Sequence, residues 1–140
     1  MRPTILAALV ALAVPVAAQS QTYRAINYLD VVPLTSTTFE VIESDGKGAR
    51  GIWCAAADYA ERKLRYYGRI YISEGRAPSR SYPGRKSVIF TTDVNSLTQE
   101  PTTSLTLSTT RVGVGLPANH AIQFCRPADY DLGELMLRRK

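Results

Sequence analysis

The residue types in this chain that could form a nucleophilic pair are cysteine and histidine. Cys54 stands near the start of a predicted helix, where the helix dipole favours the reactive thiolate. His120 is the single histidine, and an imidazole within hydrogen-bond reach of the sulfur could remove its proton. This pair indicates one alternative function for the chain, that of a Cys54–His120 thiol hydrolase of the cell envelope.

A disulfide competes with catalysis for the same sulfur. The sequence contains two cysteines, Cys54 and Cys125, far apart in the chain. An even number of cysteines in an exported chain favours a bridge. Closing so long a loop stabilises a fold by about 4 kcal/mol in the chain-entropy treatment. We therefore expect a Cys54–Cys125 disulfide and, with it, a protein that is not an enzyme.

Other catalytic and cofactor signatures are missing from the sequence. With both cysteines bridged, one histidine is too few to predict a metal site. The sequence has no phosphate-binding glycine loop, no nucleophile elbow and no HExxH motif, so we expect no cofactor. Two carboxylate pairs, Glu40 with Glu43 and Asp58 with Glu61, are interpreted as solvated faces of their elements.

Basic side chains gather in one part of the chain. The whole sequence carries 17 Lys and Arg against 12 Asp and Glu, and residues 61–86 hold eight bases but two acids. Within this range, residues 74–85 contain two prolines and two glycines and are predicted to form a loop. Arginine forks bind carboxylates, phosphates and sulfates, and a tyrosine can stack on a sugar or base. The candidate residues for anion or partner binding are Arg69, Arg76, Arg80, Tyr82, Arg85 and Lys86.

The compartment limits the partners that this basic hairpin, residues 69–86, could meet. For an exported protein they are an acidic envelope polysaccharide, a lipid head group or an acidic protein, and nucleic acid is not expected. A solvated loop that keeps the protein soluble remains an alternative interpretation of the same charges. A structural subunit of an envelope complex is a further alternative function.

The export prediction itself depends on the first 18 residues. Arg2 gives a positive start, residues 5–14 form an uncharged apolar run, Pro15 interrupts it, and residues 16–18 are small. This order is typical of a cleavable secretory signal, and the run is shorter than the ~20 residues needed to span a bilayer. We expect residues 19–140 to form a single domain without a transmembrane segment, in the bacterial periplasm or outside the cell.

Alternating apolar and β-branched residues predict the strands that must position these side chains. Pro33 should end the first strand, and residues 70–73 and 86–92 should pair as a hairpin with a long connection. The pattern in residues 105–116 changes phase, which predicts a bulge or break near Thr109 and Thr110. The predicted strands are 23–32, 37–43, 69–73, 86–92 and 105–116.

The clearest helix is predicted over residues 51–67, with Gly68 as its stop. Its apolar residues recur at spacings of three and four and form one stripe: Trp53, Ala57, Ala60, Leu64 and Tyr67. Cys54 would lie in the first turn, beside this stripe. A short helix over residues 117–124 would carry Cys125, and residues 129–140 would form a last short helix or strand.

These elements predict an α+β fold. The sheet should be antiparallel with about four to five strands, and the long helix should pack on one face. The disulfide should join this helix to the short C-terminal helix.

Four segments, GIWCAAADYA, GRIYI, KSVIFTTD and HAIQFC, carry a family resemblance. They are similar to segments of small exported proteins of α-proteobacteria that have no assigned activity. The resemblance spans roughly residues 48–125 and implies a shared fold and disulfide. It implies no functional residues.

Overall fold

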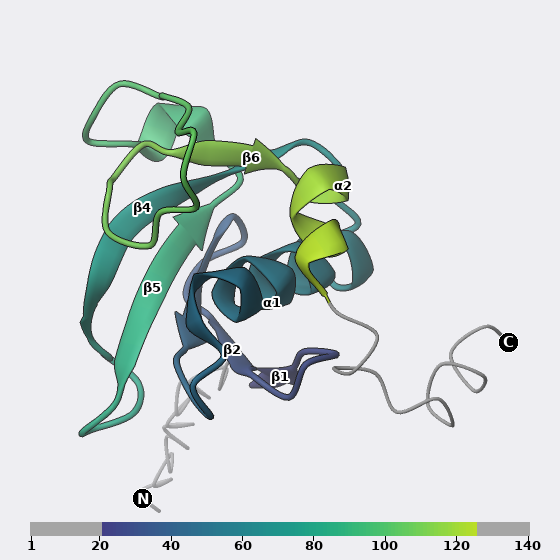
Figure 1. Cartoon of the computed structure of the whole chain (residues 1–140), viewed down its shortest axis with the longest axis vertical. Helices are drawn as coiled ribbons and strands as arrows, with labels where there is room; N and C mark the ends of the chain where they lie inside the picture. The colour runs from purple at the N-terminus through teal and green to yellow at the C-terminus, as the bar shows by residue number, and fades with distance from the viewer. Residues whose placement is uncertain (1–20, 126–140) are drawn as a thin grey trace, which may run out of the picture.

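The computed structural model describes residues 21–125 (Figure 1). The predicted signal at 1–18 and the predicted last element at 129–140 lie outside these described residues. Within 21–125, no helix has the length and hydropathy needed to cross a membrane.

Within the described residues the sheet is antiparallel, as predicted, and has six strands rather than four or five. The order across the sheet is β1-β2-β3-β5-β4-β6, so the two short strands β1 and β6 lie at its edges. These strands of two and three residues are the ones that a local pattern detects least well. The strands are β1 (Tyr23–Arg24), β2 (Asp30–Pro33), β3 (Thr38–Ile42), β4 (Arg69–Pro78), β5 (Lys86–Thr91) and β6 (Gly115–Pro117).

The long helix α1 (Gly48–Arg62) packs on one face of this sheet, which confirms the predicted layers (Figure 1). All ten residues from Gly51 to Ala60 are buried. Aromatic rings of the helix pack against rings of the strands. The ring centroids of Tyr59 and Phe39 are 4.6 Å apart, and those of Trp53 and Phe90 are 4.9 Å apart. The core therefore sits between α1 and the central strands β3 and β5.

The C-terminal end of α1 comes five residues earlier than predicted. Arg65 adopts a positive φ of 54°, which ends the helical path, and the N–H of Tyr66 donates back to the carbonyl of Ala60 at 2.9 Å. Leu64 still packs against the core, but Tyr67 is 62% exposed and does not belong to the apolar stripe. The helix also begins three residues before the predicted start, so Cys54 lies beyond its first turn.

A short C-terminal helix packs beside α1, as predicted. It consists of α2 (Ala118–Ala121) followed by the 3-10 turn η2 (Ile122–Phe124). The Cys54–Cys125 disulfide joins α1 to the residue after η2 and confirms the predicted bridge. Both cysteines are buried, so the bond lies within the packed layer between these helices.

The predicted loop over residues 74–85 is in large part strand. β4 continues to Pro78 and pairs with β5 through two register shifts, one after Ile72 and one after Glu74. Such irregularities bend and twist a strand. Gly75 sits at this bend because a side chain there would come within 2.4 Å of the Thr110 carbonyl oxygen. The connection from β4 to β5 is therefore shorter than the sequence indicated.

The predicted strand over residues 105–116 is wrong for most of its length. After the 3-10 turn η1 (Val94–Ser96), the chain forms a long loop that reaches β6. The phase change in the sequence corresponds to a turn, in which the Ser108 hydroxyl accepts hydrogen bonds from the N–H groups of Thr110 and Arg111. A break near Thr109 and Thr110 is thus present, but as a turn rather than a bulge.

The predicted strand over residues 23–32 is interrupted. The chain turns after β1 and returns as β2, and the turn is closed by the N–H of Tyr28 donating to the Ala25 carbonyl at 2.9 Å. Tyr28 has a positive φ of 69°, a conformation that is rare outside glycine. Asn27, which is fully buried, donates from its side chain to the Gly51 carbonyl at 2.8 Å and ties this turn to α1.

Candidate functional site

The structure pairs three of the six candidate basic-hairpin residues within the chain. Arg76 binds the Glu43 carboxylate through two nitrogens, with Nη2 at 2.8 Å from Oε1. Arg80 forms an ion pair with Glu74. Arg69 donates from Nη1 to the Gly115 carbonyl at 2.8 Å, across the β4–β6 edge. These guanidinium groups are held in place by the protein's own acceptors.

The pairing with Arg76 affects the pKa of Glu43. The hydrogen bonds from Arg76, together with the positive charges of Arg76 and Lys86, hold the pKa of Glu43 below its usual value against a smaller opposing effect of burial. Lys86 is exposed at the start of β5. An anion that approached Arg76 would have to displace Glu43, so this side of the hairpin is a poor free binding site.

The remaining candidates, Tyr82 and Arg85, line a cavity of about 330 Å³, which we call the turn cleft. Three turns meet there: the β1–β2 turn, the β3–α1 turn and the β4–β5 turn. Among the described residues no acceptor is found for the Arg85 guanidinium. The cleft is lined by Arg24, Tyr28, Asp30, Ser44, Asp45, Tyr82 and Arg85.

A buried carboxylate positions the Tyr82 side of the turn cleft. Glu40 of β3 is fully buried. Its Oε1 accepts hydrogen bonds from the hydroxyls of Ser79 (2.7 Å) and Ser87 (2.6 Å) and from the Arg80 N–H (2.9 Å), and its Oε2 accepts one from Ser81. These hydrogen bonds tie the β4–β5 turn and the start of β5 to Glu40 of β3.

Among the described residues, the groups at hydrogen-bond distance from the Glu40 carboxylate are uncharged hydroxyls and a backbone N–H. Burial alone raises the pKa of this carboxyl, but the hydrogen bonds from Ser81, Ser87, Ser79 and Arg80 outweigh burial and hold the pKa below its usual value. The interpretation of Glu40 and Glu43 as a solvated face is therefore wrong: Glu40 is inside, and Glu43 is paired with Arg76.

A second buried carboxylate positions the β1–β2 side of the cleft. Asp58 of α1 is fully buried, and its Oδ2 accepts hydrogen bonds from the Tyr23 hydroxyl at 2.8 Å and from the Ile26 N–H at 3.0 Å. Its Oδ1 lies 2.8 Å from Arg62 Nε as an ion pair, without a hydrogen bond. Asp58 is thus not part of a solvated face either, whereas Glu61 beside it is partly exposed.

The turn cleft combines groups that can bind a sugar or another polar ring. Tyr28 and Tyr82 provide aromatic faces, and the Arg24 guanidinium lies 5.9 Å from the centre of the Tyr28 ring. Asp45 and Ser44 can accept hydrogen bonds from hydroxyls. Arg24 is already paired with Asp30 at 2.9 Å, so Arg85 is the arginine available to a ligand anion.

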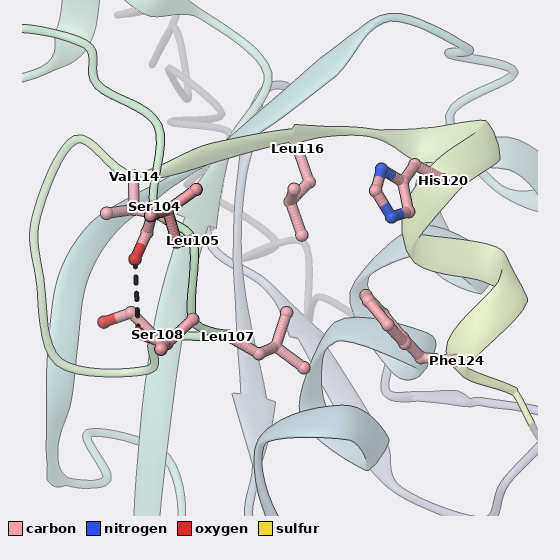
Figure 2. A pocket seen from close by; sticks show the side chains of 9 residues that line it. Ser104, Leu105, Leu107, Ser108, Val114, Leu116, His120 and Phe124 are labelled. Atoms are coloured by element: carbon pink, nitrogen blue, oxygen red, sulfur yellow. Dashed lines mark hydrogen bonds between the residues drawn. The ribbon is translucent and has the colours of Figure 1, made fainter.

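The Cys54–His120 pair is not assembled in this structure. The Cys54 sulfur is bonded to Cys125, and neither cysteine is free. His120 instead lines a separate, apolar cavity of about 220 Å³, the apolar pocket, where it stands beside Phe124 and faces Leu107 and Leu116 (Figure 2). Its ring centre lies 5.7 Å from that of Phe124. A hydrolase that uses this thiol would require the disulfide to be reduced first.

Within residues 21–125 no group of three or more His, Cys, Asp or Glu side chains is arranged to hold a metal ion.

Comparison with protein-family models, with curated proteins and with solved structures gives no match. The resemblance to exported α-proteobacterial proteins therefore stays a prediction.

Sequence reasoning missed most of the turn cleft. Tyr28 falls within the predicted strand 23–32, and no pattern in the sequence marks Asp45 as a binding residue. One signal was present: Ser79, Ser81 and Ser87 recur around the β4–β5 turn, at positions where hydroxyls can converge on one acceptor. The acceptor itself is about 40 residues away in the chain, as the 39-residue separation of Ser79 and Glu40 illustrates.

Proposed function

We propose that this protein is an exported, non-enzymatic domain that binds an acidic polysaccharide of the cell envelope in the turn cleft. The observation that carries the proposal is that Arg85, whose guanidinium has no acceptor among residues 21–125, lines one cavity together with Tyr28 and Tyr82. Of the six predicted binding residues, the proposed site uses Tyr82 and Arg85. Arg69, Arg76 and Arg80 already have acceptors within the protein.

The chemistry of the cleft favours an acidic sugar over a lipid head group. Aromatic faces can stack against pyranose rings, and a guanidinium fork matches a carboxylate or sulfate. Asp30 and Asp45 lower the net charge of the cleft, which disfavours a densely charged surface such as an anionic membrane. The same carboxylates can accept hydrogen bonds from sugar hydroxyls.

Support also comes from backbone strain at the cleft. Tyr28 and Asp45 both have positive φ angles, 69° and 56°, and neither is a glycine. Each such conformation costs about 1–3 kcal/mol, and these outliers cluster at functional sites. Here the buried Asn27 holds the β1–β2 turn in place and keeps the Tyr28 ring at the cleft. The disulfide is consistent with an oxidising, extracytoplasmic compartment.

The test is a calorimetric titration with oligogalacturonate at low salt, with neutral dextran and anionic lipid vesicles as separate arms. We expect saturable binding to oligogalacturonate and to neither of the others. Arg85→Ser and Tyr82→Ala should each weaken binding by about tenfold, the loss of one charge-assisted or stacking contact.

The matched control is Arg76→Ser, which removes an arginine of the same hairpin that is already bound to Glu43. This variant should bind like the parent protein. If Arg76→Ser and Arg85→Ser weaken binding equally, attraction is a property of the whole basic hairpin and the cleft is not the site. Binding to vesicles with no response to oligogalacturonate would replace the proposed partner with a membrane.

A further inference from the structure

The apolar pocket lies between the loop that precedes β6 and the helical segment α2–η2, and all of its lining residues fall within residues 104–124. Its walls are formed by leucines, a valine and the Phe124 ring, and hydroxyls and the His120 imidazole stand among them (Figure 2). An apolar cavity with a few polar groups is the usual form of a small-ligand site. None of the glycan-binding groups of the turn cleft lines this pocket.

Two neighbouring residues of α1 hold the opposite walls of the pocket. Trp53 donates from Nε1 to the Ser108 carbonyl at 2.7 Å and fixes the loop wall. Cys54 is bonded to Cys125 and fixes the end of the helical wall that carries His120 and Phe124. Both α1 residues are fully buried. The pocket is therefore preorganised by the core, which lowers the ordering cost of binding a ligand.

An apolar side chain stands uncovered at this pocket. Leu105, one of its lining residues, has a relative exposure of 108%, the largest among the exposed large hydrophobic side chains. Other lining residues, Leu107, Leu116 and Phe124, are only partly buried although they pack against the core. A ligand with an apolar body would remove this surface from water, which favours its binding.

The polar groups at the helical wall favour an anionic end on that ligand. Among the residues 21–125 that the structure describes, no acidic side chain lines the pocket, whereas His120 can donate a hydrogen bond. Arg50 does not line the pocket, but its guanidinium carbon lies 5.0 Å from the centre of the Phe124 ring, which does. The volume of about 220 Å³ corresponds to about seven or eight water-sized groups. A drug-sized molecule would not fit.

We propose that the apolar pocket binds a short aliphatic carboxylate of about six to eight carbons, with the chain among the leucines and the carboxylate at His120. This site is independent of the turn cleft and of the proposed glycan. It gives the domain a second ligand of different chemistry.

The experiment titrates the full chain with octanoate, 1-octanol and octylamine, which share one aliphatic body and differ in the head group. Binding is measured by calorimetry, and its place by the NMR shifts of the His120 ring and the Leu116 methyl groups. We expect octanoate to bind about tenfold more tightly than octanol, the effect of one charge-assisted hydrogen bond, and octylamine to bind most weakly.

Two variants at exposed positions test the assignment without disturbing the core. His120→Gln should reduce octanoate affinity to near that of octanol and leave octanol unchanged. Leu105→Ser should weaken both ligands. Arg85→Ser, in the turn cleft, is the control and should bind octanoate like the parent protein, so that failure of one site is distinguishable from failure of the other.

Three results would overturn the inference. Octanoate and octanol could bind equally, which would leave an apolar pocket without head-group recognition. Octanoate could shift resonances only elsewhere in the protein. Finally, the parent protein could show no saturable binding of millimolar octanoate.

Discussion

Glu40 and Asp58 are both completely buried carboxylates, and each fixes one side of the turn cleft. Glu40 is surrounded by uncharged donors, three serine hydroxyls and one backbone N–H, all from the β4–β5 turn and the start of β5. Asp58 has a tyrosine hydroxyl and a backbone N–H from the β1–β2 region, and Arg62 of its own helix as an ion-pair partner.

The difference shows two ways in which a fold can bury a negative charge. A carboxylate that accepts several hydrogen bonds stays charged without a cation beside it, because each donor dipole replaces part of the lost hydration. Such an arrangement also restrains every segment that supplies a donor. Glu40 therefore restrains the β4–β5 turn, whereas Asp58 joins the β1–β2 region to α1.

The largest expected effect comes from removing each carboxylate. Glu40→Ala would leave four donors without their acceptor, and Asp58→Ala would leave two, so each should destabilise the protein by about 3 kcal/mol in denaturant unfolding. Amide hydrogen exchange should separate them. Glu40→Ala should accelerate exchange at Arg80, and Asp58→Ala at Ile26.

Glu100→Ala is the control for that pair, because Glu100 is an exposed acid of the loop after η1. It should change stability by less than about 0.5 kcal/mol. A Glu40→Ala variant as stable as Glu100→Ala, with unchanged exchange at Arg80, would show that the serine donors do not hold the turn.

A smaller effect is expected from acidification. The pKa of Glu40 is lower in the folded protein than its usual 4.5, so its contribution to stability is complete above that pH and is lost as the pH falls through the folded value. Glu43, whose pKa is lowered by Arg76, contributes with the same sign. The free energy of unfolding should therefore decrease below about pH 4.5.

Glu40→Gln isolates the pH dependence of stability that is due to the Glu40 carboxyl. This variant should have a shallower fall of unfolding free energy between about pH 4.5 and pH 2, with urea unfolding at several pH values as the measurement. Arg76→Gln should remove the contribution of Glu43 and leave that of Glu40. An unchanged slope in Glu40→Gln would contradict a lowered pKa for this carboxyl.

The smallest expected effect concerns Glu61, one turn of α1 beyond Asp58. Burial and the negative charge of Asp58 raise the pKa of Glu61, with Arg62 opposing them in part. The folded state thus disfavours this charge at neutral pH, the opposite of Glu40. Glu61→Gln should stabilise the protein at pH 7 by less than about 0.5 kcal/mol, and the gain should vanish at low pH, where Glu61 is protonated. A loss of stability at pH 7 would contradict this interpretation.

Local patterns predicted the parts of the fold that local rules govern. The alternation in residues 37–43 and 86–92 corresponds to β3 and β5, and Trp53, Ala57 and Ala60 of the predicted stripe lie in the fully buried part of α1. The candidate site was predicted less well. Of its six residues, only Tyr82 and Arg85 line the turn cleft, because the pairing of an arginine depends on which acid the fold brings to it.

The sequence by itself determined the α+β class, the position of the long helix, the β4–β5 hairpin and the cysteine pairing. Periodicity and residue type encode these features because side-chain direction repeats over a few neighbouring residues. The tertiary structure alone decided that Glu40 is buried, that Arg76 is bound to Glu43, and that three separate turns meet in one cleft. These facts join residues that are far apart in the chain, such as Glu43 and Arg76 with a separation of 33 and Glu40 and Ser87 with a separation of 47. No pattern within a single element can specify such a contact, since it forms only when the sheet order places β3 against β5.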